Sequence, residues 1–302
     1  MSEAGAAATT VEIPAPTRRR RPWLALLVGA WRQGRTKIGL LLLFSLLGVA
    51  LLGPYFAPYS PTEFVAPPFS TPADFGGAGA DYLGRDVLSR FLWGGRSVLT
   101  LSLLATLMGM ILGTAIGLVA AYSRGVLDDV LMRAMDVLLS FPQIVFALVL
   151  AATVGPALWL LVLAVGITTT PRVARIARGA AVEVVERDFI RAAEAIGEPR
   201  RRILLSDVLP NITGPLVVEA SLRLSFNIAV VAGLSFLGFG IQPPNADWGL
   251  MINENRNGLT IQPWPVVLPV AAIGLLTIAT SLVGDGLSRS VAGIDGGGRS
   301  RE

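Results

Sequence analysis

Residues 98–122 read VLTLSLLATLMGMILGTAIGLVAAY, a run of 25 residues without a charged side chain. A helix of about 20 apolar residues is long enough to cross the hydrocarbon core of a bilayer, which is roughly 30 Å thick. Small residues recur at every fourth position of this run: Ala105, Gly109, Gly113, Gly117 and Ala121. Because such a groove lets a second helix approach closely in lipid, the run predicts a membrane-spanning helix packed against another helix of this chain or of a partner.

Five similar runs extend this prediction to the whole chain. Of its 302 residues, 53% are hydrophobic and only 15% are charged, whereas soluble domains carry about 25% charged residues. We expect an all-α integral membrane protein with six transmembrane helices. The expected spans cover residues 38–56, 98–122, 137–154, 157–170, 216–240 and 264–284.

The basic residues are distributed unevenly between the two sides of the expected bundle. With the N-terminus inside, seven Lys and Arg fall in residues 1–37, two in 123–136, eight in 172–215 and three after residue 285, which makes 20. The outer segments hold four, and Arg223 lies within a span. Since basic residues collect in cytoplasmic loops, both termini are expected in the cytoplasm.

Residues 1–37 combine an Ala-, Pro- and Thr-rich stretch with four consecutive arginines, Arg18 to Arg21. We interpret them as a disordered basic tail followed by a short interfacial helix. A twin-arginine export signal is the competing interpretation. It is disfavoured because the following apolar stretch is short and no small-residue cleavage site follows it.

The composition excludes several chemistries. The chain contains no Cys and no His, so it lacks a thiol nucleophile, a Ser-His-Asp triad and the HExxH zinc motif. Its single lysine, Lys37, is not part of a GxxxxGK[ST] phosphate loop. We therefore expect no catalysis, no cofactor and no metal site. We also expect no nucleic-acid binding, because lipid and topology account for basic residues at span ends.

Between the first two spans lie about forty outer residues, rich at first in Pro and Gly and then amphipathic. Apolar side chains at Val87, Leu88, Phe91 and Leu92 alternate with polar ones at Arg85, Asp86, Ser89 and Arg90. This pattern predicts a helix lying on the outer membrane surface. A plain connector is the alternative.

The inner loop, residues 172–215, carries the most information. Apolar residues spaced by three and four positions predict one amphipathic helix. They are Val182, Val185, Phe189, Ala193 and Ile196. Gly197 and Pro199 are expected to end that helix, with the glycine in a left-handed conformation. A second short helix then leads to Pro210, so the loop is expected to be a helix, a glycine turn and a helix.

Within this loop, the sequence RAAEAIGEPRRRILLSDVLPN at residues 191–211 resembles a known signature. Permease subunits of binding-protein-dependent ABC importers carry EAA, three residues, G, nine residues and I-x-LP at the corresponding place. The matching positions are Ala192, Ala193, Gly197, Leu209 and Pro210. Arg191 replaces the usual Glu, as is typical of the oligopeptide and dipeptide branch. Asp207 replaces the usual Ile, and we have no account of it.

Other stretches resemble the second, C-type permease chain of the same branch. GADYLGRD at residues 79–86 is similar to its GTDxxGRD, and SFP at 140–142 resembles its AFP. LSFLGFGIQPPNADWGLMI at 234–252 is similar to LSFLGLGxxPPxxxWGxML, and GDGL at 284–287 also fits, although the expected RDxLDPR does not follow. The motifs keep the family order over most of the chain.

The resemblance implies a type I importer in the inner membrane of a bacterium. Two six-span permease chains, here a heterodimer, would share the pathway, with two ABC ATPase subunits beneath them and an extracytoplasmic solute-binding protein above. The loop tip would be the coupling helix that sits in a groove of an ATPase subunit. Its residues are Arg191, Ala192, Ala193, Glu194, Ala195, Ile196, Gly197, Glu198 and Pro199. The alternative from the residues alone is an amphipathic helix resting on the inner membrane surface.

Three polar residues share one face of the fifth span, because Glu219, Arg223 and Asn227 are four residues apart. Ionisable residues within spans usually face protein or a water-filled cavity. They are candidates for lining the pathway. The alternative is a Glu219–Arg223 pair that packs against a neighbouring helix.

Two other classes of membrane protein fit the sequence less well than a permease. An intramembrane enzyme lacks a His base, and LSFLG at 234–238 does not match GxSxG. A self-contained carrier would need repeated, broken spans and its own coupling-ion site. Within the importer class, di- and oligopeptides are the expected substrates. Nickel and glutathione are alternatives, and nickel is disfavoured by the absence of His and Cys.

These predictions divide the chain into four parts. Residues 1–37 are the cytoplasmic tail and interfacial helix, and 38–97 the first span with the outer segment. Residues 98–285 are the core permease domain with its coupling loop at 172–215, and 286–302 a second cytoplasmic tail.

Overall fold

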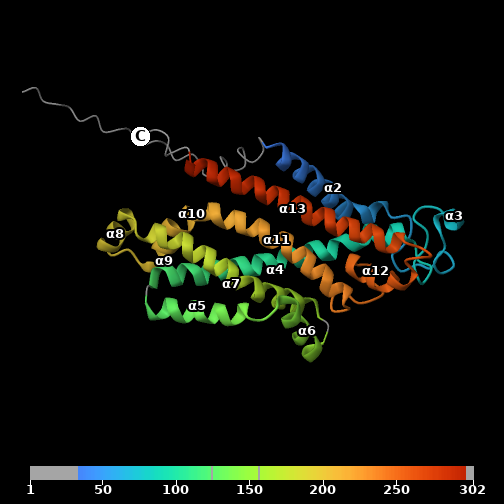
Figure 1. The fold of residues 1–302 in the computed structure, drawn as a ribbon, viewed down its shortest axis with the longest axis horizontal. Helices are drawn as coiled ribbons and strands as arrows, with labels where there is room; N and C mark the ends of the chain where they lie inside the picture. Colours follow the sequence, from blue (N-terminus) through green and yellow to red (C-terminus); the bar gives the residue numbers. More distant parts are fainter. Residues whose placement is uncertain (1–32, 124, 156, 297–302) are drawn as a thin grey trace, which may run out of the picture.

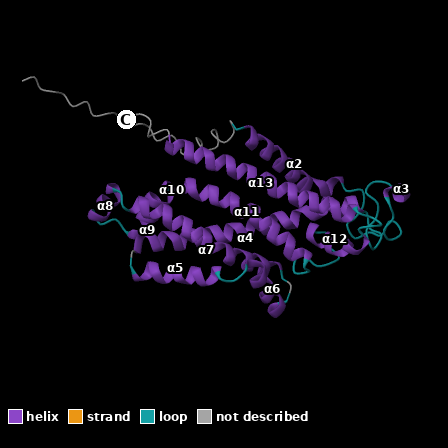
Figure 2. Cartoon of the chain, viewed as in Figure 1, coloured by secondary structure: helices purple, strands orange, loops and turns teal. Residues whose placement is uncertain are grey.

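The fold was analysed in a computed structural model, which describes residues 33–123, 125–155 and 157–296 (Figure 1). The described residues are helical apart from connecting loops and two isolated β-bridges (Figure 2). The bundle is formed by α2 (Gly34–Phe56), α4 (Val87–Ser123), α5 (Val126–Leu139), α6 (Gln143–Val154), α7 (Leu158–Val185), α11 (Thr213–Phe236) and α13 (Trp264–Gly296). Five of these helices are individually long and apolar enough to cross a bilayer, and α5 with α6, bent by 79°, makes a sixth when the bent pair is counted as one broken span. The all-α prediction is confirmed, with six spans on that count.

Shorter helices lie at the two ends of the bundle. Near one end are α8 (Asp188–Ala195), α9 (Arg200–Arg202), a π-helical turn (Ile203–Val208) and α10 (Leu209–Asn211). At the opposite end are α3 (Pro72–Phe75), α12 (Trp248–Asn255) and a 3-10 turn (Arg256–Gly258). Figure 1 shows α8 and α3 at opposite extremes of the long axis. The loop predicted to contact an ATPase subunit and the segment predicted to lie outside are thus at opposite ends of the spanning helices.

The small-residue groove of α4 packs against α7 of the same chain. A Cβ added at Gly113 would lie 2.5 Å from the Cβ of Val173, and one added at Gly117 would lie 2.6 Å from the carbonyl oxygen of Ala174. Gly109 lies in the same way against Thr169. The packing interpretation is therefore confirmed, with the partner helix inside this chain. This α4–α7 pair is the centre of the fold.

The prediction that the outer segment forms a helix on the membrane surface is wrong. Residues from Val87 onward are the first turns of α4, which runs on without a break to Ser123. Arg85, Asp86, Ser89 and Arg90, expected to face water, are all buried. The amphipathic pattern was correct as a pattern, but its polar face is covered by protein because these side chains bond to one another and to the segment that contains α12.

Several helix boundaries also differ from those expected. α2 begins at Gly34 rather than at residue 38, and α13 continues to Gly296, so most of the expected C-terminal tail is helical. α7 continues past residue 170 as far as Val185, with Pro171 inside it. Arg172 therefore lies in the middle of a membrane helix and not at the start of the loop. The N-terminal stretch 1–32, with the proposed interfacial helix, lies outside the described residues.

Candidate functional site

The loop tip predicted to contact an ATPase subunit is closed by a helix-ending motif. The N–H of Gly197 donates to the carbonyl of Glu194 (3.0 Å), and the N–H of Glu198 donates to that of Ala193 (3.1 Å). These two bonds form a Schellman motif, which requires a left-handed residue after the helix. Gly197 has φ +79°, as the sequence predicted. The turn after α8 is therefore fixed by its backbone.

The prediction of a single helix over residues 182–196 is wrong. α7 ends at Val185, and α8 starts at Asp188 in a new direction after Arg187, whose backbone is extended. Ile190, which the spacing left off the apolar face, is the fully buried residue of α8, whereas Ile196 is 78% exposed. Ile190 packs with Val185 and Ile203 in one cluster. Because the helix breaks at Arg187, a single period of 3.6 residues fails across it.

Most of the tip is therefore free on the surface of this chain. Of residues 191–199, only Ala193 and Glu198 are half-buried and the others are exposed. The ion pairs there, Arg191–Asp188 at 3.8 Å and Arg202–Glu198 at 3.7 Å, are long and solvated. The arrangement presents a rigid, exposed helix end, which fits a docking element.

Tyr122, in the last turn of α4, fastens the loop to the bundle. Its ring packs against the cluster that contains Ile190 and Ile203. The guanidinium carbon of Arg200 lies 5.8 Å from the ring centroid, and the Glu194 carboxylate lies beside its hydroxyl. The sequence analysis did not identify this residue, because nothing in its apolar surroundings distinguishes it from an interfacial tyrosine.

The structure separates the three polar residues of the fifth span into two environments. Arg223 Nε and Glu219 Oε1 are 2.9 Å apart, with little of either side chain exposed. Asn227 is fully buried and bonds to three helices: its Nδ2 donates to Thr106 Oγ1 (2.9 Å), and its Oδ1 accepts from Thr169 Oγ1 (3.2 Å) and, at a longer distance, from Gln143 Nε2 (3.5 Å). The position of Asn227 therefore favours packing, whereas Glu219 and Arg223 pair with each other within α11.

A buried ion cluster joins the outer segment to α12, and the sequence analysis did not identify it. Asp81 Oδ2 accepts from Arg85 Nε (2.7 Å) and Arg90 Nη1 (2.6 Å). Glu254 Oε2 lies 3.0 Å from Arg85 Nη2 and 2.8 Å from Arg90 Nη2. No side chain of the four is more than 6% exposed. The sequence did contain a signal for this cluster, because two of its charged residues, Asp81 and Arg85, stand between and beside glycines in the stretch GADYLGRD.

Burial dominates the protonation of the carboxyl groups at this end. It raises the pKa of Glu254 to about 7, with the charge of Asp81 adding to the rise and Arg85 opposing it. It also raises the pKa of Asp247, while hydrogen bonds from Ser97 and the Leu250 N–H oppose the rise. Asp247 caps α12 through that N–H (3.0 Å) and accepts from Ser97 Oγ of α4 (2.5 Å). These contacts hold α4, α12 and the outer loop together.

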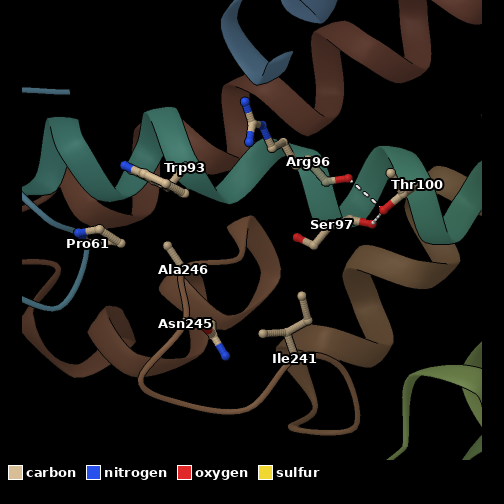
Figure 3. A pocket seen from close by; sticks show the side chains of 8 residues that line it. All are labelled: Pro61, Trp93, Arg96, Ser97, Thr100, Ile241, Asn245 and Ala246. Atoms are coloured by element: carbon tan, nitrogen blue, oxygen red, sulfur yellow. Dashed lines mark hydrogen bonds between the residues drawn. The ribbon is translucent and has the colours of Figure 1, made fainter. Parts of the chain in front are cut away.

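Beside Ser97 is a cavity of about 330 Å³, between the first turns of α4 and the segment that precedes α12 (Figure 3). Its lining is formed by Pro61, Trp93, Arg96, Ser97, Thr100, Ile241, Asn245 and Ala246. The Arg96 guanidinium points away from the cavity in Figure 3 and donates to the Leu51 carbonyl of α2 (2.6 Å). The cavity is thus walled mainly by neutral groups. Within the described residues, no cluster of His, Cys, Asp and Glu is suited to hold a metal ion.

Comparison with known proteins agrees with the architecture. Residues 113–293 match the family described as the binding-protein-dependent transport system inner membrane component. The chain belongs to this family. It is therefore an inner-membrane, multi-pass permease subunit of an ABC importer, without catalytic activity of its own, and it works with ATPase and substrate-binding partners.

Relatives lie in the branch that the motifs indicated. The di/tripeptide transport system permease protein DppC of Pseudomonas aeruginosa is 36% identical over 256 residues, covering 82% of this permease and 84% of the relative. The glutathione transport system permease protein GsiD of Pectobacterium atrosepticum is 35% identical over 270 residues, covering 89% and 90%. A chain of the inward-facing MetNI methionine ABC transporter has the same fold, with a TM-score of 0.54 at 18% identity, covering 68% of this permease and 96% of that chain.

Proposed function

We propose that this permease forms half of the translocation pathway for di- and oligopeptides, and that a second, different permease chain forms the other half. Relatives named as di/tripeptide and dipeptide permeases, at 36% and 32% identity, support the substrate class. ATP is hydrolysed by two partner subunits on the cytoplasmic side, and a solute-binding protein delivers the peptide from the other side.

The coupling tip is the observation that carries this proposal. Residues 191–199 present an exposed helix end that the Schellman motif and Gly197 hold in one conformation. A rigid element transmits a rigid-body movement that a flexible loop would absorb. We infer that this tip sits in a groove of an ATPase subunit and couples its movement to the spans.

Orientation follows from the charge distribution. We propose that both termini and the coupling loop are cytoplasmic, with the ion cluster and α12 outside. A cysteine introduced at Ala73 should then react with an impermeant maleimide in whole cells, whereas one at Ala195 should react only after the membrane is opened. The chain is naturally free of cysteine, so each label reports a single position. The reverse pattern would contradict the six-span orientation.

The polar face of α11 takes two roles in this proposal. The Glu219–Arg223 pair borders the pathway in its cytoplasmic half, because ionisable groups within a span are costly unless they face protein or a water-filled cavity. Asn227 was a candidate for the same lining. Its bonds to Thr106 and Thr169 support a role in fixing α11 against α4 and α7 instead.

Purification of the affinity-tagged chain from its native membrane tests the proposal. ATPase subunits and a second permease are expected to copurify, and the complex in liposomes should take up a labelled dipeptide when its solute-binding protein and ATP are supplied. The chain alone should neither bind nor hydrolyse ATP. A pure chain that hydrolyses ATP, or a complex that transports no peptide, would contradict the proposal.

Glutathione is the second candidate substrate, because the chain is 35% identical to a named glutathione permease. Competition separates the two: excess glutathione should leave dipeptide uptake unchanged if peptides are the substrates. Saturable glutathione uptake that dipeptides do not inhibit would favour the alternative.

A further inference from the structure

Three arginines of α7 and α11, namely Arg172, Arg175 and Arg223, lie within spanning helices, and one of the three has no acidic partner. Arg175 of α7 pairs with Asp136 of α5, and Arg223 of α11 pairs with Glu219. Arg172, one turn before Arg175, makes no ion pair with any described residue. Of these three arginines, Arg172 is therefore the one whose charge no carboxylate of the described residues balances.

Arg172 lies far from both ends of its helix. It follows Leu158 by 14 residues and precedes Val185 by 13, which at 1.5 Å per residue places it about 20 Å from each end. A hydrocarbon core of roughly 30 Å that begins near Leu158 therefore includes it. An arginine at such a depth is costly unless it faces protein or a water-filled cavity.

Its side chain is directed away from the packed core. On α7, Thr169 and Val173 lie against the glycines of α4, whereas Arg172, Arg175 and Ile176 are exposed on this chain. The exposed stripe of α11 is adjacent, and Arg172 and Arg223 meet there at Phe226, whose side chain is 45% exposed. The guanidinium carbon of Arg172 lies 5.8 Å from the centroid of the Phe226 ring, and that of Arg223 lies 6.0 Å from it.

We propose that Arg172 and Arg223, held on the Phe226 ring, form a site on the translocation pathway for the terminal carboxylate of a peptide in transit. The inference rests on the proposed function and specifies the part of the substrate that the spans contact. Arg172 supplies the free charge and Arg223 a second guanidinium whose charge is already balanced by Glu219. Guanidinium groups bind carboxylates through charge-assisted hydrogen bonds, and stacking on an aromatic ring pre-orients them.

Charge-selective labelling tests the site without relying on transport. Ile176, one turn from Arg172 on the same face, is replaced by Cys in the complete importer. The labelling rates of the permease chain are measured with a sulfonate-bearing and with a trimethylammonium-bearing methanethiosulfonate. We expect both reagents to react. The ratio of the anionic to the cationic rate should fall by about tenfold when Arg172→Gln is added, since one charge within several ångströms is removed. Arg172→Lys should keep most of the ratio.

Arg35→Gln is the matched control, because Arg35 is an exposed arginine at the start of α2 and should not change the ratio. No labelling at position 176 by either reagent would place this face against lipid or the second permease and would overturn the proposal. A ratio that is unchanged in Arg172→Gln would do the same.

A second part of the experiment uses peptides to test which ligand the site binds. The dipeptide Ala-Ala at millimolar concentration should slow labelling by about threefold or more, its C-terminal amide should have little effect, and Arg172→Gln should abolish the difference. Equal protection by both peptides, or protection by anionic phospholipid alone, would overturn the proposal. Peptide uptake by the wild-type complex is assayed in parallel. If the wild-type complex transports peptide and the Ile176→Cys complex shows no carboxylate-dependent protection, the site is wrong and the proposed function stands. If the wild-type complex transports none, the proposed function itself has failed.

Discussion

The two ends of this permease use charged residues in opposite ways. At the end proposed to lie outside, Asp81, Arg85, Arg90 and Glu254 are buried, and their arginine–carboxylate distances are 2.6–3.0 Å. At the end proposed to be cytoplasmic, Arg191 and Asp188 are 3.8 Å apart and mostly exposed. Buried charges must be paired, and removing one partner is costly, whereas exposed pairs contribute little. The outer end is therefore locked by its side chains, while the coupling end is held by its backbone and leaves its side chains free for a partner.

The largest expected effect concerns the buried ion cluster of Asp81, Arg85, Arg90 and Glu254. Asp81→Ala leaves Arg85 and Arg90 buried with one carboxylate between them, and we expect a loss of about 3–5 kcal/mol in the free energy of unfolding. Thermal unfolding of the purified chain in detergent measures it. Asp188→Ala, which removes a solvated pair, should change stability by less than about 0.5 kcal/mol. Equal effects of the two substitutions would remove the contrast between the ends.

A second prediction concerns the backbone of the coupling end. Gly197→Val forces a branched residue into the left-handed region, at a cost of about 1–2 kcal/mol. An added Cβ meets no atom within 4 Å, so the cost is conformational and is confined to the turn. We expect a chain that inserts normally but binds its ATPase subunits poorly, with little transport and with ATPase activity no longer stimulated by the loaded solute-binding protein.

Ser206→Ala, an exposed residue outside the tip, is the control for that variant and should behave as wild type. Normal stimulation and transport in Gly197→Val would show that the loop does not carry the coupling.

The middle of the bundle gives a smaller effect. Asn227→Leu keeps the volume of the side chain but leaves Thr106 without its bond from Asn227, and hydrogen bonds between membrane helices are worth about 1 kcal/mol. If Asn227 fastens α11 to its neighbours, the yield of assembled complex should fall together with transport. Altered transport at an unchanged yield of complex would instead indicate that Asn227 lines the pathway.

How far the sequence predicts this molecule differs between its regions. The spans and the packing face of α4 followed from apolar length and from the spacing of Gly109, Gly113 and Gly117, which are local properties, whereas the partner helix α7 did not. The conformation of Gly197 also followed, because a helix end is a local event. The outer cluster did not: Arg85 and Glu254 are 169 residues apart in sequence, and an alternating pattern is the same whether water or protein covers its polar face. The break at Arg187 was missed because the apolar spacing continues across it.

The smallest expected effect concerns how the coupling end is tied to the rest of the bundle. Tyr122 lies between Glu194 and Arg200, at the inner end of the same helix whose first turns are locked in the ion cluster. A displacement of α4 should thus reach the loop through this ring as well as through α7. Tyr122→Phe keeps the ring and removes the hydroxyl, so assembly and basal ATPase should stay unchanged. The ratio of stimulated to basal ATPase should fall by about two- to fivefold, the effect of one modest hydrogen bond. Tyr59→Phe, an exposed tyrosine of the outer segment, should leave that ratio unchanged. If Tyr122→Phe also leaves it unchanged, α7 alone transmits the movement, and the two ends of α4 are not linked through this contact.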